Sequence, residues 1–526
     1  MRSASPRTAR RPARIGVVAA VVAVALVLSG CASTFLPAKS GSTSSPTNEK
    51  VAADLAPYYH QVLSWTSCGS GMQCTYAKVP LDWSKPSGST IKLALVRHIA
   101  TDGHPLGSLL VNPGGPGASG YNLIKQSLSF AVDSTLSKNY TIVGFDPRGV
   151  NKSTAVKCYT NPKVLDNFIY GIPKGTPGSD AWITEEEQEN KQFGADCEKY
   201  TGALLGHVDT VSAAKDMDVL RAALGDKKLN YLGYSYGTLL GQTYANLFPK
   251  KTGRLVLDGV VDPTVTPFQL DEYQAVGFED NLKAFLADCP KLKDCPFTGT
   301  VAQSMTEIRG LLDKLDASPI RNSDGRELGS ETMFSAIIFP LYNTSEWQYL
   351  ADLFDDVDNG SARVAFILAD AYNDRNTNGT YQDNETEAFN AINCLDYPSD
   401  PDVTTMRTQA AELNKVAPVL GHLMAYGGTS CYDWPYKPTR TAGALEAKGS
   451  APILVVGTTD DPATPYAMAV HVSKLLQNGH LITYHGNGHT AYNKNKTPAD
   501  ECVNTAVDNF FVHGTVPKTD PQCGAS

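Results

Sequence analysis

The chain has 526 residues, of which 42% are hydrophobic and 19% are charged, and its formal net charge is −9. This length is enough for two or three domains, and the composition excludes both gross disorder and a multi-span membrane protein. The acidic balance also argues against nucleic acid or an anionic membrane surface as a binding partner.

The first thirty residues have the pattern of an export signal. Five arginines precede an apolar stretch at 15–28, which is short for a membrane-spanning helix. The stretch ends in Leu28-Ser29-Gly30-Cys31, which resembles a bacterial lipobox. We therefore expect cleavage before Cys31 and lipidation of its thiol, with an ordinary signal peptide as the alternative. Cleavage removes five Arg and no acidic residue, so the net charge falls from −9 to −14.

Ten cysteines remain after Cys31, and an even number is typical of disulfides in a protein outside the cytosol. The simplest pairing joins neighbours in chain order: Cys68–Cys74, Cys158–Cys197, Cys289–Cys295, Cys394–Cys431 and Cys502–Cys523. A zinc site is the alternative, but the spacings lack paired C-x₂-C units. Sequence alone does not establish the connectivity.

Short apolar segments alternate with helical patterns through the first half of the chain. The predicted strands are 91–99, 108–112, 140–145, 228–232 and 254–257, and the predicted helices include 209–224 and 238–248. Buried strands that alternate with helices predict an α/β fold with a mostly parallel sheet flanked by helices.

This alternation stops after Pro263 and resumes with predicted strands at 452–456 and 481–484. The intervening segment is richer in helical patterns, which predicts a largely helical cap inserted late in the sheet. A separate tandem domain is the alternative. We predict five parts: a lipoprotein signal peptide at 1–30, a flexible tether at 31–52, a first core segment at 53–263, a cap at 264–445 and a second core segment at 446–526.

One pentapeptide carries the strongest chemical signal. Ser235 is the centre of Gly233-Tyr234-Ser235-Tyr236-Gly237, between a predicted buried strand and a predicted helix. A G-x-S-x-G motif on a strand-to-helix turn is typical of the nucleophile elbow of α/β-hydrolases. The motif alone arises readily by chance, so its structural context is what gives it weight.

A serine nucleophile needs a general base, and the base needs an acid to orient it. His489 is the predicted base, because it lies on a loop just after a predicted strand, and His485 is the alternative. The acid is expected after the preceding strand, where Asp461 is favoured over Asp460. Asp258, one strand earlier, is the third candidate.

The reaction also needs N–H groups that stabilise an oxyanion. We expect one from Tyr236, the residue after the nucleophile, and the other from Gly115 in the Gly-rich loop at 112–117. The sequence has no phosphate-binding loop, H-E-x-x-H motif or dinucleotide fingerprint, so we expect neither a cofactor nor a metal.

Five segments together resemble the secreted tripeptidyl aminopeptidases of high-GC Gram-positive bacteria, which are relatives of prolyl aminopeptidases in the α/β-hydrolase superfamily. These segments are 112–117, 144–149, 233–237, 461–465 and 488–490, and the resemblance extends from about Tyr58 to Cys523. Ser235, Asp461 and His489 match the catalytic positions, and the choice of Asp461 over Asp460 rests mainly on its D-P-x-T-P context.

The resemblance implies an extracytoplasmic serine peptidase that acts near the free N-terminus of a peptide. Such an enzyme needs cap carboxylates to bind the substrate's α-ammonium group, and Asp396 is our nominee because the neighbouring Cys394 would fix its position. The nearest alternative is a carboxylesterase or lipase that acts on small acyl esters. An alternative of another class is a non-catalytic binding lipoprotein, anchored to the membrane only through Cys31.

Overall fold

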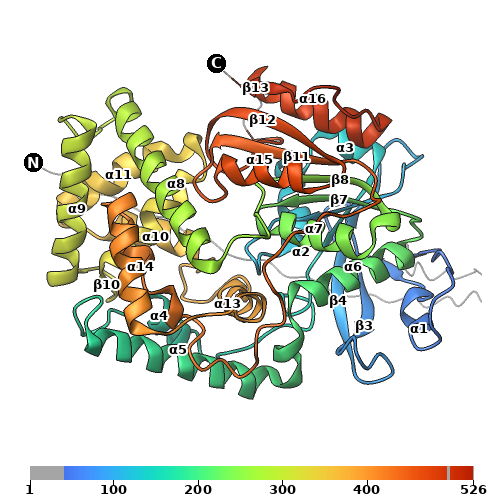
Figure 1. The fold of residues 1–526 in the computed structure, drawn as a ribbon, viewed down its shortest axis with the longest axis horizontal. Coiled ribbons are helices and arrows are strands. Elements are labelled where there is room, and N and C mark those ends of the chain that lie inside the picture. The colour runs from blue at the N-terminus through green and yellow to red at the C-terminus, as the bar shows by residue number, and fades with distance from the viewer. Residues whose placement is uncertain (1–40, 495–497, 525–526) are drawn as a thin grey trace, which may run out of the picture. The chain divides into compact units, whose positions relative to one another are not determined.

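The computed structural model describes residues 41–494 and 498–524, and its main feature is a sheet with the strand order β1-β2-β3-β4-β6-β5-β7-β8-β11-β12-β13 (Figure 1). Neighbours from β1 to β4, and the β4–β6 pair, are antiparallel, whereas all neighbours from β6 to β13 are parallel. The strands are β1 Ser42–Thr43, β2 Ser64–Ser67, β3 Gln73–Pro80, β4 Thr90–His98, β5 Ser108–Asn112, β6 Thr141–Phe145, β7 Leu229–Tyr234, β8 Thr252–Asp258, β11 Ile453–Asp460, β12 Gly479–Asn487 and β13 Gln522–Gly524.

Helices cover both faces of this sheet, which confirms the predicted α/β class. Alternate residues of β8 show why: Leu255 and Leu257 belong to one apolar core, whereas Val256 belongs to another. Because successive strand side chains point to opposite faces, a strand buried on both faces is apolar throughout. The first core contains residues of α6 Thr210–Leu224, α7 Tyr236–Leu247 and α15 Tyr466–Leu475; the second contains residues of α2 Gly120–Ala131, α3 Ser134–Asn139 and α16 Pro498–His513.

A helical insertion separates β8 from β11, and we call it the cap. It has an apolar core of its own, and most of its helices lie left of the sheet in Figure 1. The cap elements are α8 Pro267–Asp288, α9 Val301–Ala317, β9 Ile320–Arg321, β10 Glu327–Leu328, α10 Ser330–Leu341, α11 Trp347–Asp358, α12 Arg363–Tyr372, α13 Glu385–Asp396 and α14 Val403–Val416.

Two helices that precede the nucleophile also contact the cap. These are α4 Pro162–Tyr170 and α5 Asp180–Thr201, which lie in the predicted first core segment. Arg375 of the cap forms an ion pair with Asp166 of α4, and the Trp182 ring of α5 lies 5.3 Å from that of Tyr426. The sequence pattern did not indicate this association.

The signal peptide, Cys31 and the first part of the predicted tether lie outside the described residues. The folded chain nevertheless begins before the predicted boundary at residue 53, because β1 pairs with β2 and Glu49 forms ion pairs with Arg221 and Lys251. Arg221 is buried, so Glu49 supplies a charge partner that a buried guanidinium requires. A short helix, α1 Ala56–Tyr59, follows.

Five disulfides connect neighbouring cysteines in chain order, as the sequence analysis predicted. Cys158–Cys197 fixes α5 to the segment after β6, and Cys394–Cys431 closes the segment after α13. Across the described ranges, no helix combines the length and apolar character that crossing a bilayer requires.

Candidate active site

The turn between β7 and α7 presents Ser235. From Tyr231 to Ala245, every residue is buried except Ser235, which is partly exposed. Its backbone has φ 53° and ψ −125°, a conformation that L-residues rarely adopt and that is found at functional sites. A Cβ atom on Gly233 would lie 2.4 Å from the Gly237 carbonyl oxygen, so the tight turn requires glycine at position 233. The strand and helix therefore hold the Ser235 side chain at the surface of a buried layer.

Asp461 and His489 meet at the carboxyl ends of β11 and β12. Nδ1 of His489 lies 2.9 Å from each carboxylate oxygen of Asp461. Asp461 also accepts hydrogen bonds from the N–H groups of Ala463, Thr464 and Thr490, at 2.8–3.2 Å. These donors fix a buried carboxylate against the Nδ1 edge of the imidazole.

The second ring nitrogen of His489, Nε2, is buried and has no hydrogen-bond partner among the described residues. The backbone N–H of His489 donates to Tyr342 O at 2.9 Å, and the two rings meet edge to face at 5.3 Å. An imidazole held on its Nδ1 side by a carboxylate carries its basic lone pair on Nε2, where it can accept a proton.

The other two acid candidates have different surroundings. Asp460 is exposed and its carboxylate accepts from Thr459. Asp258 is buried, and its carboxylate accepts the N–H groups of Ala491 and Tyr492 at 2.8–3.1 Å. Desolvation raises the pKa of Asp258 to about 6. The backbone carbonyl oxygen of Asp258 also accepts the N–H of Ser235 at 2.9 Å. Asp258 therefore connects the elbow to the loop that carries His489.

His485, the alternative base, lies on β12, and its Nε2 is 2.8 Å from Gln522 Oε1 on β13. It has no contact with Asp461. The structure therefore brings together Asp461 and His489, whereas His485 bonds to β13, the last strand of the sheet.

The Gly-rich loop after β5 lies directly against the elbow. A Cβ on Gly114, whose φ is 108°, would lie 2.9 Å from Ser235 Cβ and 3.2 Å from Tyr236 N. The N–H of Gly114 donates to Asn112 Oδ1 at 3.0 Å, whereas that of Gly115 has no acceptor among the described residues. Tyr236 is the first residue of α7, so its N–H has no intrahelical acceptor. Both predicted oxyanion donors thus belong to segments in contact with Ser235.

Asp396, the nominated amine-binding residue, is fully buried at the end of α13. Its carboxylate accepts the N–H of Thr210 at 3.0 Å and the Thr210 hydroxyl. Thr210 is the first residue of α6, and its hydroxyl also contacts Tyr236 Oη. Asp396 therefore caps a core helix and holds α13 against the core, and its role in binding an amine stays a prediction.

Three other cap carboxylates lie next to the Gly-rich loop, and we call them the acidic cluster: Asp374, Asp383 and Glu385. Their ligand atoms all lie within 4.8 Å of one another. Glu385 Oε1 would be 3.3 Å from a Cβ on Gly115, which places the cluster beside a predicted oxyanion donor. The sequence analysis missed these residues because they are more than 250 positions from that loop and carry no local motif.

Electrostatic repulsion within the acidic cluster is not relieved by a nearby cation. Arg375 follows Asp374 in sequence but forms ion pairs with Asp166 and Asp370 instead. Over the described ranges, no Lys or Arg forms an ion pair with the cluster. Burial, reinforced by its two acidic neighbours, raises the pKa of Glu385 well above its usual value, and burial raises that of Asp383 to about 6.

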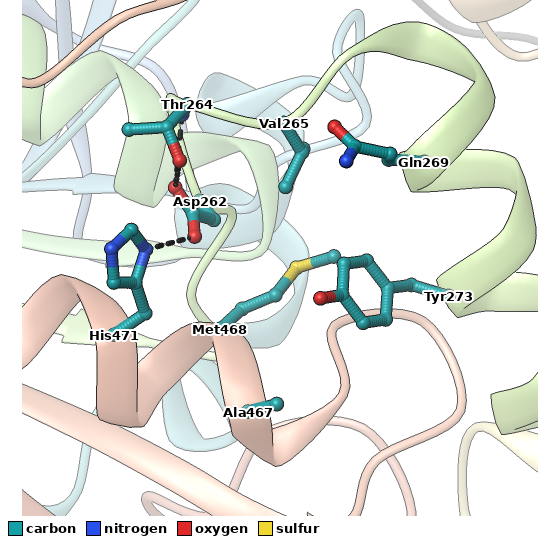
Figure 2. Close-up of a pocket in the computed structure, with 8 residues that line it drawn as sticks. All are labelled: Asp262, Thr264, Val265, Gln269, Tyr273, Ala467, Met468 and His471. Carbon is teal, nitrogen blue, oxygen red and sulfur yellow. Dashed lines mark hydrogen bonds and ion pairs between the residues drawn. The ribbon is translucent and has the colours of Figure 1, made fainter.

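A second Asp–His pair lies outside this site. Asp262 contacts Nδ1 of His471 on α15, and both line a pocket of about 340 Å³ (Figure 2). The Thr264 hydroxyl in that pocket donates to Asp262, and the lining residues include no serine or cysteine. The His471 side chain is 51% exposed, against 10% for His489. The pair therefore resembles the acid and base of a hydrolase but has no serine or cysteine in its pocket.

Comparisons with known proteins identify relatives of this chain. Residues 417–523 match the family model described as TAP-like protein. The chain is 35% identical over 530 residues to serine protease Hip1 of Mycobacterium tuberculosis (strain ATCC 25618 / H37Rv), covering 96% of each chain. It is 34% identical over 502 residues to Carboxylesterase B of the same strain, covering 93% of this chain and 94% of that protein.

The chain is also 31% identical over 473 residues to the tripeptidyl aminopeptidase of Streptomyces lividans, covering 88% of this chain and 86% of that protein. Among solved structures, proline iminopeptidase of Mycobacterium smegmatis is similar at 14% identity and a TM-score of 0.34, covering 84% of this chain and 100% of that one. The sequence relationships cover nearly the whole chain. It belongs to the tripeptidyl aminopeptidase-like family of α/β-hydrolases and is a serine hydrolase.

Proposed function

We propose that this serine hydrolase is an aminopeptidase that releases short peptides from the free N-terminus of a peptide substrate. The observation that carries the proposal is the acidic cluster beside the Gly-rich loop. A half-buried group of carboxylates without a cationic partner is unfavourable in the free protein. A bound α-ammonium group would supply the missing positive charge, and three carboxylates would each accept one of its N–H bonds.

In this mechanism Ser235 is the nucleophile. Its Oγ attacks the scissile carbonyl carbon while the hydroxyl proton moves to Nε2 of His489. The Asp461 carboxylate holds the imidazole in the tautomer that leaves Nε2 basic and then stabilises the imidazolium. Collapse of the tetrahedral intermediate breaks the C–N bond, and His489 transfers the proton to the departing amine nitrogen.

The Gly115 and Tyr236 N–H groups would donate to the oxyanion that forms in each tetrahedral intermediate. Water then attacks the acyl-enzyme, with His489 as general base, and the peptide acid leaves Ser235. The acidic cluster acts at a distance from these bonds: it fixes the substrate's N-terminus, which sets the peptide bond that reaches Ser235. Binding energy at one end of the substrate is thereby used to position the other end.

We further propose that the protein works outside the cytoplasm, anchored through a lipid on Cys31. The five disulfides support an oxidising location, and the basic and apolar pattern of residues 1–30 supports export. Labelling with radioactive palmitate tests the anchor, because Cys31→Ala would abolish incorporation if Cys31 is the lipidated residue.

The activity is tested by comparing a tripeptide p-nitroanilide that has a free amine with its N-acetyl derivative and with p-nitrophenyl butyrate. We expect kcat/KM for the free tripeptide to exceed that for the acetylated form by about 100-fold or more, since removing a charged hydrogen-bonded contact costs about 2–3 kcal/mol. Equal hydrolysis of the two peptides would contradict the proposal. Ser235→Ala should lose both activity and labelling by a fluorophosphonate.

The acidic cluster is also compatible with a divalent cation, so EDTA belongs in the same experiment. Unchanged hydrolysis of the free-amine substrate after EDTA supports direct binding of the ammonium group, whereas its loss and recovery with Ca²⁺ would contradict it. A carboxylesterase is the second candidate function, because the relative named Carboxylesterase B is 34% identical. Faster turnover of the butyrate ester than of the free tripeptide would favour that function.

A further inference from the structure

Lys494 is a half-buried cation that the proposed mechanism does not use. It lies five residues after His489, at the end of the loop that leaves β12. Its Nζ is 4.4 Å from the centroid of the Phe130 ring and 5.8 Å from that of Tyr234, the residue before the nucleophile. The lysine is therefore held next to the elbow by aromatic rings.

The backbone that precedes Lys494 is fixed. Asn493 is buried, and its Nδ2 donates to the carbonyl groups of Ser129 and Phe130 at 3.0 and 3.1 Å. The backbone N–H of Asn493 is also fixed, because it donates to Asn504 Oδ1 at 2.8 Å. The end of α2 thus anchors the loop, and the ammonium group has a defined position above the two rings.

Lys494 has an electrostatic environment that differs from that of a surface lysine. Burial lowers its pKa, and the carboxylates of Asp258, Asp461 and Glu346 oppose this shift. Within the described ranges, none of these acids forms an ion pair with Nζ. An ammonium group over aromatic rings, without a carboxylate in contact, retains N–H donors for an anionic ligand.

The position of Lys494 identifies which part of a substrate it can reach. His489 must protonate the departing amine, so the leaving group lies on the side of the His489 loop. The acidic cluster lies beside Gly115 and, in the proposed function, binds the other end of the substrate. A substrate that spans Ser235 then has its positive terminus at the acidic cluster and its leaving group near Lys494.

We propose that Lys494 binds an anionic group on the leaving part of the substrate, namely the C-terminal carboxylate of a short peptide or an acidic side chain just after the scissile bond. This inference rests on the proposed aminopeptidase function. It defines the favoured substrates as short zwitterionic peptides with an ammonium group at one end and a carboxylate at the other. Lys494 is a specificity residue, because it contacts the leaving group rather than the reacting atoms.

The test uses one tripeptide sequence with three leaving groups: alanine with a free carboxylate, alaninamide and p-nitroaniline. For the wild type we expect kcat/KM for the alanine substrate to exceed that for alaninamide by about tenfold, consistent with one charge-assisted hydrogen bond. Lys494→Met should remove this preference and leave p-nitroanilide hydrolysis within about twofold of wild type. Lys494→Arg should retain most of the preference. Two further substrates, with Asp or Asn directly after the scissile bond, distinguish binding of an acidic side chain from binding of a terminal carboxylate.

Lys199→Met is the matched control, because Lys199 Nζ also lies over a ring, 4.7 Å from the centroid of Tyr200, on the distant helix α5. It should change none of the ratios. A wild type that prefers neither the terminal carboxylate over the amide nor Asp over Asn would overturn the inference, as would a Lys494→Met protein that loses all three activities equally. Failure of the proposed function has another signature, since the wild type would then hydrolyse the N-acetylated p-nitroanilide as well as the free one.

Discussion

The elbow around Ser235 and the acidic cluster of the cap lie next to each other, yet different forces hold their side chains. Beside Ser235, hydrogen bonds hold the acid of the site in place: Asp461 accepts from His489 and from three backbone N–H groups. In the acidic cluster, Asp374 and Glu385 share a hydrogen bond, burial raises the pKa of both carboxyl groups, and repulsion from Asp374 and Asp383 raises that of Glu385 further.

From this difference we expect the core to act in the chemical step and the cap to act in substrate binding. A preorganised, fully hydrogen-bonded group stabilises a transition state without rearrangement, so damage to it should lower kcat. A cluster of unneutralised carboxylates stabilises a cation that arrives with the substrate, so damage to it should raise KM for substrates that carry a free amine. The predictions below test this division.

The largest effect is expected for Asp461→Asn. The amide can no longer hold His489 in the productive tautomer, so kcat should fall by about 10³–10⁴-fold for peptide and ester substrates alike. Asp262→Asn is the matched control, because Asp262 contacts His471 in a pocket without a nucleophile. It should retain activity within about threefold. Comparable losses in both variants, measured by steady-state kinetics, would show that the two pairs are not functionally distinct.

Glu385→Gln should raise KM for a free-amine tripeptide substrate by about 10–100-fold, because it removes one charge-assisted contact to the ammonium group. Hydrolysis of p-nitrophenyl butyrate should change by less than about threefold. Glu387→Gln is the control: Glu387 is a buried carboxyl on the same helix, and burial raises its pKa to about 7, but it is not part of the acidic cluster. An equal KM effect in both variants would assign the change to the folding of α13.

The pH dependence should differ between substrates. Burial raises the pKa of Asp383 to about 6 and that of Glu385 well above its usual value, so the acidic cluster gains protons and loses negative charge as the pH falls from 7 to 5. The ratio of kcat/KM for the free-amine substrate to that for the butyrate ester should therefore fall several-fold over this range. It should fall again above about pH 8, where the α-amino group loses its proton. The ratio cancels the pH dependence of catalytic steps that both substrates share, and a ratio independent of pH would argue against an ammonium site.

The smallest expected effect is on stability. Glu385 has a raised pKa in the folded protein, so its contribution to stability is retained at low pH and lost as the pH rises through that value. Glu385→Gln, which is neutral at every pH, should increase the free energy of unfolding by about 1 kcal/mol at pH 8. The difference should vanish near pH 4. Chemical denaturation at the two pH values measures it, and a destabilised variant at pH 8 would show that Glu385 makes favourable contacts instead.

Sequence patterns were most informative where the interactions are local. The alternation of apolar segments predicted β5, β7, β8, β11 and β12 close to their observed bounds, since a strand buried on both faces has to be apolar along its length. The disulfides join neighbours along the chain, and that pairing was predicted too. The elbow was predicted from five consecutive residues because its steric requirements fall within one turn.

The cap was harder to interpret, as Asp396 and Glu385 demonstrate. Both are acids on α13, eleven positions apart, and the sequence offers no reason to prefer one as an amine ligand. In the folded chain Asp396 caps α6, whereas Glu385 lies beside Gly115 and two other carboxylates. The direction in which each end of a helix faces depends on packing against distant segments, which no local pattern encodes.

The sequence by itself determined the sheet, the elbow and the residue types proposed as nucleophile, base and acid, because strand burial and turn geometry are properties of short segments. Only the tertiary structure decided which carboxylates gather next to the Gly-rich loop and that Lys494 lies over the ring of Tyr234. Those arrangements depend on long-range contacts between the cap, the core and the loop after His489. The electrostatic potential at a site depends on all the charged groups around it in space, and only the fold determines which residues those are.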